Sequence, residues 1–475
     1  MNKETDKIKV IDARMGRGKT SAAISYMKEN AGEKRFLYIT PYLDEVDRIC
    51  TECSELGFVQ PDLKESRSKS ADIKRLLAMG SNIASTHASY ALLDDEALRM
   101  IEAKGNYSLI IDESLDVVAP VNMSDSDIRM LMEKHGTLDS DYYITNISEE
   151  YKGEAFADFQ KDVNRNSGFR FKILNYDKKE EMPSEAEEEE EKKDGCSVVK
   201  VMKPELLTAF SEVIVMTYLF AGQYMKAYFD FFGFSYDICG VDTSNGYHFS
   251  NGPDKPELVD YSKLIHIVDS ARLNNIGEKD CSLSLNWFKN NAPEEESNES
   301  TTRSSKSNVS HRRKSGKKKK GVQQLKCKLN TFYQSYAKTT EILLWTTYKK
   351  YKCNMYGDRS RFKDKVGEDD PSKTTFLTLT ARATNMFKDK WALAYLANRY
   401  LNPNIYKFFF SPDPSKSDRK IRIDKDVFAL SEMLQWIWRS RIRDNKEIVV
   451  YIPSKRMRNL LKGWIEDVSK GGDAE

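Results

Sequence analysis

The first half of the chain alternates short apolar runs with stretches of helical periodicity. Five apolar runs have the length of buried strands: 8–12, 36–40, 83–86, 109–111 and 213–216. Helical periodicity falls between them, over 21–29, 43–56 and 94–103. Parallel strands that are buried on both faces have continuous apolar runs, and helices between them supply the crossovers that they need. The pattern therefore predicts an α/β domain with a parallel sheet.

A second set of the same elements follows in the C-terminal part of the chain. The runs expected to form strands are 342–345, 375–379 and 448–452, and those expected to form helices are 390–399 and 428–441. This alternation predicts a second parallel-sheet domain. The expected fold class is α/β, with two parallel-sheet domains in tandem.

Two low-complexity segments interrupt these patterns. Residues 178–195 are acidic, and residues 291–321 pass from Glu and Ser to Lys and Arg. Such compositions cannot bury enough apolar surface to offset the entropy of ordering, so we expect both segments to be disordered insertions. Gly, Pro and Asn cluster near 250–260 and mark a domain boundary. The expected parts are an ATP-binding domain over 1–250, a connecting segment over 251–330 and a second domain over 331–475.

Composition narrows the class of protein. A chain of 475 residues is long enough for two domains with cores of their own. It lacks the apolar run of about 18 residues that a membrane span needs, and its polar start leaves no room for a signal peptide. We therefore expect a cytoplasmic protein. Cys50 and Cys53 form the one closely spaced cysteine pair, without a second pair or a histidine nearby, so we interpret them as plain helix cysteines.

The net charge of +2 conceals two opposed runs, an acidic one at 185–191 and a basic one at 311–320. A basic run attracts phosphates, but such runs are also common in solvated linkers. The sequence leaves both interpretations open for residues 311–320.

A glycine-containing segment predicts a nucleotide site. Residues 13–20 read Ala-Arg-Met-Gly-Arg-Gly-Lys-Thr and depart from G-x-x-x-x-G-K-[ST] only at the first position. The segment lies between a predicted strand and a predicted helix, where backbone N–H groups can converge on phosphate oxygens. Lys19 is expected to reach the β- and γ-phosphates, and Thr20 to hold Mg²⁺. The expected nucleotide-binding residues are Ala13, Gly16, Arg17, Gly18, Lys19 and Thr20.

An acidic pair ends the apolar run of residues 107–111. Asp112 is expected to hold Mg²⁺, and Glu113 to polarise the attacking water. An acidic pair after a strand is by itself often only the start of a loop. The nucleotide segment in the same predicted sheet favours the hydrolytic interpretation.

The order of these motifs resembles superfamily 2 (DEAD/DEAH-like) helicases, of a type often encoded by phages. The resemblance rests on residues 13–20, 38–41, 86–87, 112–114 and 435–443. It implies two RecA-like domains that hydrolyse ATP with Mg²⁺, and a DNA helicase or translocase in replication or recombination. DNA, single-stranded or forked, is then the expected partner, with RNA as the alternative and replication proteins as further candidate partners. The expected location is the cytoplasm, which is the bacterial host cytosol for a phage-encoded protein.

The resemblance also assigns contacts with nucleic acid. Seven residues fall in the family's strand-contacting segments: Thr40, Pro41, Arg48, Thr86, His87, Arg382 and Asn385. Small hydroxyls and an arginine suit a sugar-phosphate chain that is bound without base specificity. His87 fits a buried structural side chain equally well, and Trp345 fits a core residue better than a base-stacking one. Thr217 matches the threonine of the family's Ser-Ala-Thr coupling motif.

In the second domain, residues 435–443 resemble the family's Gln-x-x-Gly-Arg-x-x-Arg motif. It implies catalytic roles for Gln435, Arg439 and Arg443, with the arginines directed at the γ-phosphate. Arg439 is the preferred finger, and its spacing from Arg443 predicts one helical face. Trp438 replaces the glycine and the last arginine lies one residue late, so Arg441 and Arg443 are not ranked.

Two other classes remain open. An ATP-gated clamp or scaffold would bind nucleotide and nucleic acid without unwinding. A packaging motor would also need a nuclease site with clustered carboxylates. Asp369, Asp370, Asp424 and Asp426 are the candidates for such a site, although each fits a loop or helix cap better.

Overall fold

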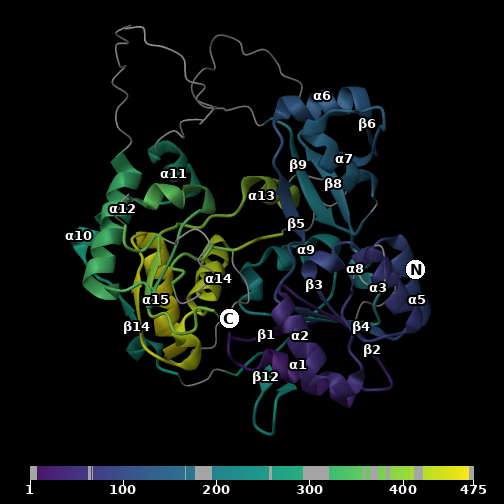
Figure 1. Cartoon of the computed structure of the whole chain (residues 1–475), viewed down its shortest axis with the longest axis horizontal. Coiled ribbons are helices and arrows are strands. Elements are labelled where there is room, and N and C mark those ends of the chain that lie inside the picture. The colour runs from purple at the N-terminus through teal and green to yellow at the C-terminus, as the bar shows by residue number, and fades with distance from the viewer. Residues whose placement is uncertain are drawn as a thin grey trace. The chain divides into compact units, whose positions relative to one another are not determined.

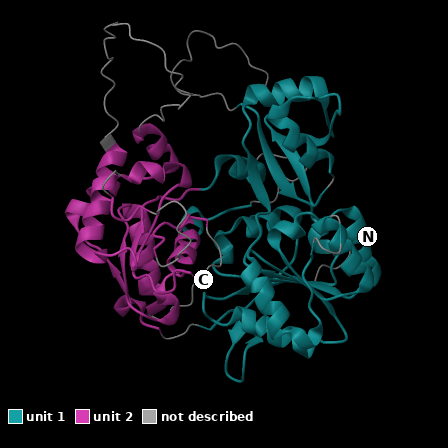
Figure 2. Cartoon of the chain, in the orientation of Figure 1, with its two compact units in different colours: residues 1–255, 401–428 teal, residues 256–400, 429–475 magenta. Residues whose placement is uncertain are grey.

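The computed structural model divides the chain into two compact units (Figure 2). Unit 1 comprises residues 1–255 and 401–428, and unit 2 comprises residues 256–400 and 429–475. The residues that the structure describes are 8–62, 66, 68–165, 167–176, 195–255, 259–292, 320–356, 360–363, 373–380, 386–410 and 421–469. The segments expected to be disordered, 178–195 and 291–321, lie mainly outside these ranges.

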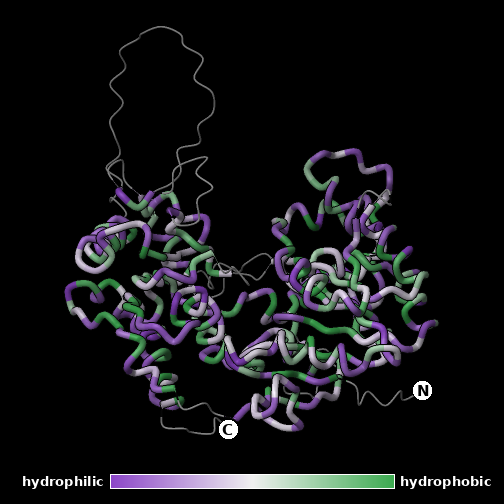
Figure 3. The backbone as a smooth tube through the Cα atoms, turned by 60° about the horizontal axis from the view of Figure 1, so that its bottom comes forward, coloured by the Kyte–Doolittle hydropathy of each residue, from purple (hydrophilic) through white to green (hydrophobic). Residues whose placement is uncertain are grey.

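A parallel sheet of six strands forms the centre of unit 1. Its order is β11-β1-β10-β4-β2-β3, and every pair is parallel. The strands are β1 (Ile8–Asp12), β2 (Arg35–Thr40), β3 (Ile83–Thr86), β4 (Tyr107–Asp112), β10 (Glu212–Thr217) and β11 (Asp237–Cys239). The first five are the strands that the apolar runs predict, and most of their residues are buried. Figure 3 shows the hydrophobic stretches of the chain in green.

Helices connect these strands and cover the sheet (Figure 1). They are α1 (Lys19–Glu29), α2 (Leu43–Glu52), α3 (Lys69–Met79), α4 (His87–Tyr90), α5 (Asp95–Lys104), α8 (Glu205–Thr208) and α9 (Tyr224–Phe232). Apolar side chains from the two faces of the sheet enter separate clusters, so both faces are buried. This explains why the strands have apolar runs without alternation.

An antiparallel sheet is inserted between β4 and β10. Its order is β5-β9-β8-β7-β6. The strands are β5 (Val118–Val121), β6 (Gly136–Leu138), β7 (Tyr143–Ile147), β8 (Phe169–Leu174) and β9 (Ser197–Met202), accompanied by α6 (Asp125–His135) and α7 (Ala157–Asn164). One face packs on α6 and α7, and α13 (Pro403–Phe410) packs against β5, β8 and β9. The sequence did not predict this sheet.

Unit 2 contains a parallel sheet of four strands in the order β14-β17-β16-β15. The strands are β14 (Ile265–Ile267), β15 (Leu343–Thr346), β16 (Ala392–Tyr395) and β17 (Ile448–Tyr451). The helices are α10 (Ala271–Asn274), α11 (Leu285–Asn291), α12 (Lys320–Phe332), α14 (Lys425–Ile437), which begins in unit 1, and α15 (Lys455–Ser469). The expected α/β class with two parallel sheets is confirmed.

Two elements of unit 2 were predicted wrongly. Residues 390–399, expected to be helical, contain strand β16, whose four residues are all buried between its neighbours β15 and β17. A short apolar run that is buried on every side has no face to reveal its period. Residues 375–379 form no strand: Phe376 makes a single bridge to Trp345. Among the described helices, none is both long and apolar enough to cross a membrane.

Candidate nucleotide site

The glycine loop, residues 13–18, joins β1 to α1. Gly16 and Gly18 both have φ of 84°, in the left-handed region that glycine adopts without strain. Gly18 is the N-cap of α1, so the free N–H groups of the helix begin at the loop. The loop therefore has the conformation and the helix terminus that an anion site needs.

Lys19 lies over this loop and among carboxylates. Its ammonium donates hydrogen bonds to the carbonyl oxygens of Ala13 and Arg14, the latter at 3.0 Å. Burial lowers the pKa of Lys19, and the charges of Glu113, Asp112 and Asp12 oppose that effect. The ends of β1 and β4 thus place the lysine of the loop and the acidic pair in one electrostatic cluster.

Tyr38 connects the two expected magnesium ligands. Its hydroxyl donates to Oδ2 of Asp112 at 3.1 Å, and it also has a hydrogen bond with the side chain of Thr20. Burial, together with the charges of Glu113 and Glu45, raises the pKa of Asp112 to about 7. A cation beside Asp112 would favour its ionised form. A hydroxyl and a carboxylate are ligands that suit Mg²⁺.

Glu113 adopts a backbone conformation that is rare for a side-chain-bearing residue. Its φ is 65°, and its N–H donates to the carbonyl oxygen of Met216 on β10 at 3.0 Å. A non-glycine residue in the left-handed region is strained, and such strain is concentrated at functional sites. Its backbone is therefore fixed at the end of β4 by the neighbouring strand.

The loop after β10 contacts the end of β1. Oδ2 of Asp12 accepts the N–H of Phe220 at 3.0 Å. Thr217, which pairs with Asp12 in the sheet, accepts a hydrogen bond from Nε2 of Gln223 at 2.6 Å. The segment that resembles the coupling motif thus lies beside the strand that leads into the glycine loop.

The expected nucleic-acid residues of unit 1 divide into two groups. Thr40 and Thr86 pair across β2 and β3 at the carboxyl ends of these strands, with Pro41 next in the chain. Nε2 of His87 lies 3.0 Å from the carbonyl oxygen of Asp112, which joins this group to the acidic pair. Arg48 comes from a different element, helix α2.

Thr40, Thr86 and Arg48 are each buried or in contact with other residues of unit 1. Thr40 is fully buried, and the Thr86 hydroxyl caps α4 by accepting the N–H of Ser89 at 3.2 Å. Arg48 forms ion pairs with Glu52 at 2.7 Å and Glu45 at 3.4 Å. Arg382 and Asn385 lie outside the described residues, so their role stays a prediction.

The arginines of unit 2 do not share a helical face as predicted. Helix α14 contains Gln435 but ends at Ile437, and the extended backbone of Ser440 separates it from a short 3₁₀ turn at Arg441–Asp444. Arg439 is buried before this break and Arg443 is exposed after it. Arg441 lies over the ring of Trp391 at 5.2 Å and donates to the carbonyl oxygen of Glu447 at 2.5 Å.

The structure also describes several residues for which the sequence allowed two interpretations. Trp345 is fully buried and donates to Oγ1 of Thr375 at 3.1 Å, so it belongs to the core. Asp424 caps the start of α14 by accepting the N–H groups of Asp426 and Val427. Asp369 and Asp370 lie outside the described residues. Cys50 and Cys53 are free thiols on and after α2. Among the described residues, no group of three or more His, Cys, Asp or Glu side chains is arranged to hold a metal ion.

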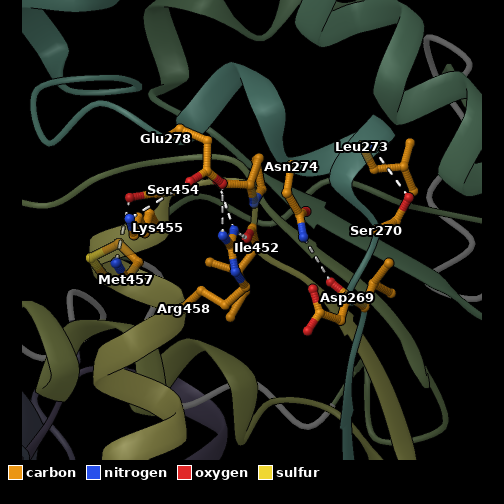
Figure 4. A network of polar contacts seen from close by, with 12 residues as sticks. Asp269, Ser270, Leu273, Asn274, Glu278, Ile452, Ser454, Lys455, Met457 and Arg458 are labelled. Atoms are coloured by element: carbon orange, nitrogen blue, oxygen red, sulfur yellow. Dashed lines mark hydrogen bonds and ion pairs between the residues drawn. The ribbon is translucent and has the colours of Figure 1, made fainter.

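Arg458, in the segment after β17, has a structural role (Figure 4). Its guanidinium donates to the carbonyl oxygens of Ile452 and Pro453 at 2.9 and 3.0 Å and pairs with Glu278 at 3.1 Å. We expect Arg458→Ala to destabilise unit 2 by about 2–3 kcal/mol, because these acceptors would lose a charged donor. All six tryptophans belong to unit 2, so tryptophan fluorescence during urea unfolding reports on this unit alone.

Lys462→Ala is the matched control for this measurement. Lys462 is on the same helix and pairs with Asp269 at 3.6 Å, but the two side chains are 43% and 79% exposed. Its removal should change the free energy of unfolding by less than about 1 kcal/mol. Equal effects of the two substitutions would contradict the role of Arg458.

Both the whole chain and its C-terminal part are similar to known proteins. A family model described as the YonV C-terminal Rossmann-like domain matches residues 259–465. Two solved structures are similar in fold. One is named XPD_APO, with a TM-score of 0.44, 12% identity, and 96% of each chain covered. The other is Xpd4 of S. tokodaii, with a TM-score of 0.45, 13% identity, and 96% of this chain and 94% of that chain covered.

A similar protein in sequence comes from Bacillus subtilis (strain 168) and is named SPbeta prophage-derived uncharacterized protein YonV. It is 32% identical over 479 residues, which cover 97% of this chain and 99% of that protein. At this identity and coverage, the relation extends over both units. The chain belongs to the YonV family.

Proposed function

We propose that the chain is an ATP-dependent nucleic-acid motor, a DNA helicase or translocase that hydrolyses ATP with Mg²⁺. The observation that carries the proposal is the meeting of Lys19, Asp112 and Glu113 at the carboxyl ends of β1 and β4. These strands are separated by β10 alone, so one nucleotide can touch both the glycine loop and the acidic pair. Carboxyl ends of parallel strands are the usual ligand-binding edge of such sheets.

The residues of this edge can divide the work of hydrolysis. The N–H groups of the glycine loop and Lys19 would bind the phosphates and stabilise negative charge on the transferring group. Thr20 and Asp112 would hold Mg²⁺, which supplies charge neutralisation between the phosphates when bound. Glu113 would orient the attacking water and accept its proton.

Nucleic-acid binding is proposed at the neighbouring strands. Thr40, Thr86 and His87 lie at the same edge of the sheet, and the contact of His87 with the Asp112 carbonyl offers a path from strand binding to hydrolysis. Arg439 of unit 2 is proposed as the finger, since Arg441 already contacts Trp391. The relative is named as prophage-derived, and we propose phage replication or recombination as the process that the motor serves.

The proposal is tested by ATP turnover with and without nucleic acid. We expect single-stranded or forked DNA to increase phosphate release, and we expect displacement of a labelled strand from a fork in the presence of ATP. Duplex DNA and RNA serve as comparison substrates. Arg439→Ala should lower stimulated turnover, and Arg441→Ala is its matched control with a smaller effect. Phosphate release that no nucleic acid changes, without strand displacement, would refute the proposal.

A further inference from the structure

A two-stranded hairpin near the end of residues 1–255, the longer of the two segments of unit 1, packs along α1. Its strands are β12 (Val241–Asp242) and β13 (His248–Phe249), and Figure 1 shows β12 beside α1. The ring of Phe249 lies 5.6 Å from that of Tyr26, and Nδ1 of His248 lies 3.1 Å from Oε1 of Glu29. The hairpin is therefore seated on the helix that follows the glycine loop.

A second attachment joins the base of the hairpin to the glycine loop itself. Arg17 donates two hydrogen bonds to the carboxylate of Asp254, each of 3.3 Å. The two side chains are 12% and 13% exposed, so this pair is largely shielded from water. Asp254 also accepts the N–H of Val241 at 3.3 Å. The charged side chain of the loop and the first strand of the hairpin thus share one carboxylate.

The tip of the hairpin is shaped by its own hydrogen bonds. Oδ1 of Asp242 accepts the N–H of Ser244 at 2.9 Å, and Nε2 of His248 lies 2.9 Å from the carbonyl oxygen of Asn245. Gly246 has φ of 93°, which permits the turn back into β13. A tip that is preformed in this way loses little conformational freedom when a ligand binds.

Tyr247 lies against the glycine loop. A Cβ atom at Gly18 would fall 2.3 Å from both Cδ1 and Cε1 of Tyr247, so the aromatic ring covers this glycine directly. Tyr247 is nevertheless 47% exposed, more than the other exposed tyrosines Tyr400 and Tyr406. The ring therefore has one side on the loop and a large area open to solvent. Its position is fixed by the attachments of the hairpin on both sides.

We propose that Tyr247 is the stacking platform for the base of the bound nucleotide, an inference that rests on the proposed function. An aromatic ring next to the phosphate-binding segment can take a base while the loop holds the phosphates. Stacking on an aromatic side chain is favourable for every base because each has a π-face. A purine covers more of the ring than a pyrimidine does. We therefore expect ATP and GTP to bind more tightly than CTP and UTP.

The experiment separates base binding from phosphate binding. Affinities of the full chain for ATP and for inorganic tripolyphosphate are measured by calorimetry with Mg²⁺. Tyr247→Ala should weaken ATP binding by roughly 10- to 100-fold, since a stacked base contributes that much affinity. Affinity for tripolyphosphate, which has no base, should not change. Tyr247→Phe keeps the ring and should retain ATP affinity, as should the control Tyr406→Ala, which removes another exposed tyrosine of unit 1.

Each other outcome overturns the inference. Unchanged ATP affinity in Tyr247→Ala would show that the ring does not bind the base. Equal loss of ATP and tripolyphosphate would show that Tyr247 only supports the loop, and tighter ATP binding would show that the ring obstructs the site. If the proposed function itself is wrong, the unsubstituted protein will bind neither ATP nor tripolyphosphate. This result differs from all those above.

Discussion

Replacing Lys19 with alanine should lower ATP turnover by about 100- to 1,000-fold, the loss typical of removing one preorganised donor from developing phosphoryl charge. Lys19 is the basic side chain that the structure places over the glycine loop and beside Asp112 and Glu113. Its removal should also weaken ATP binding, because charge-assisted hydrogen bonds to the phosphates would be lost. Phosphate release and calorimetric affinity measure the two effects separately.

Lys28→Ala is the matched control for this substitution. Lys28 is on the same helix, α1, where its ammonium pairs with Glu55 at 2.7 Å and its side chain is 42% exposed. Its removal takes away the same charge without touching the loop, so turnover should change little. If Lys19→Ala and Lys28→Ala retained equal turnover, the nucleotide site would have to lie elsewhere.

Glu113→Gln should reduce ATP turnover by about 100- to 10,000-fold, the range for loss of a general base. Glutamine has nearly the same shape and hydrogen-bonding reach as glutamate, but it cannot accept the proton of the attacking water. ATP affinity should be retained, because the phosphates are bound by the glycine loop and Lys19. Single-turnover phosphate release and equilibrium binding of ATP measure the two quantities.

The control for the charge itself is Glu45→Gln. Like Glu113, Glu45 raises the pKa of Asp112, but it lies on α2 and pairs with Arg48. Turnover should therefore change little in Glu45→Gln. If the unsubstituted protein bound ATP without releasing phosphate, and Glu113→Gln behaved in the same way, an ATP-gated clamp would replace the motor as the preferred function.

The sequence was sufficient to predict five of the six strands in the sheet at whose edge we propose the nucleotide site. Strands β1, β2, β3, β4 and β10 appear as apolar runs because both faces of the sheet are covered. The same runs end at chemically distinctive residues, namely the glycine loop after β1 and Asp112 at the end of β4. Local pattern and local chemistry therefore coincide there.

Contacts between distant residues left no such local pattern. Arg17 and Asp254 are separated by 237 positions, so nothing near Arg17 in sequence indicates its partner. Tyr38 lies inside an apolar strand, where its ring is an ordinary core residue and only the fold brings its hydroxyl to Asp112. The break after α14 depends on the backbone of Ser440, whereas the spacing of Arg439 and Arg443 indicated one continuous helix.

The discontinuous make-up of unit 1 has a consequence for its synthesis. When the ribosome has added Lys255, the six strands of the parallel sheet are complete, but α13 is still to be translated. In the finished protein, Phe408 and Phe409 of α13 pack on Phe231. At about 5–20 residues per second, translation needs roughly 7–30 seconds to reach α13. The nascent chain therefore carries an uncovered aromatic surface for that interval, which is a natural binding site for a chaperone.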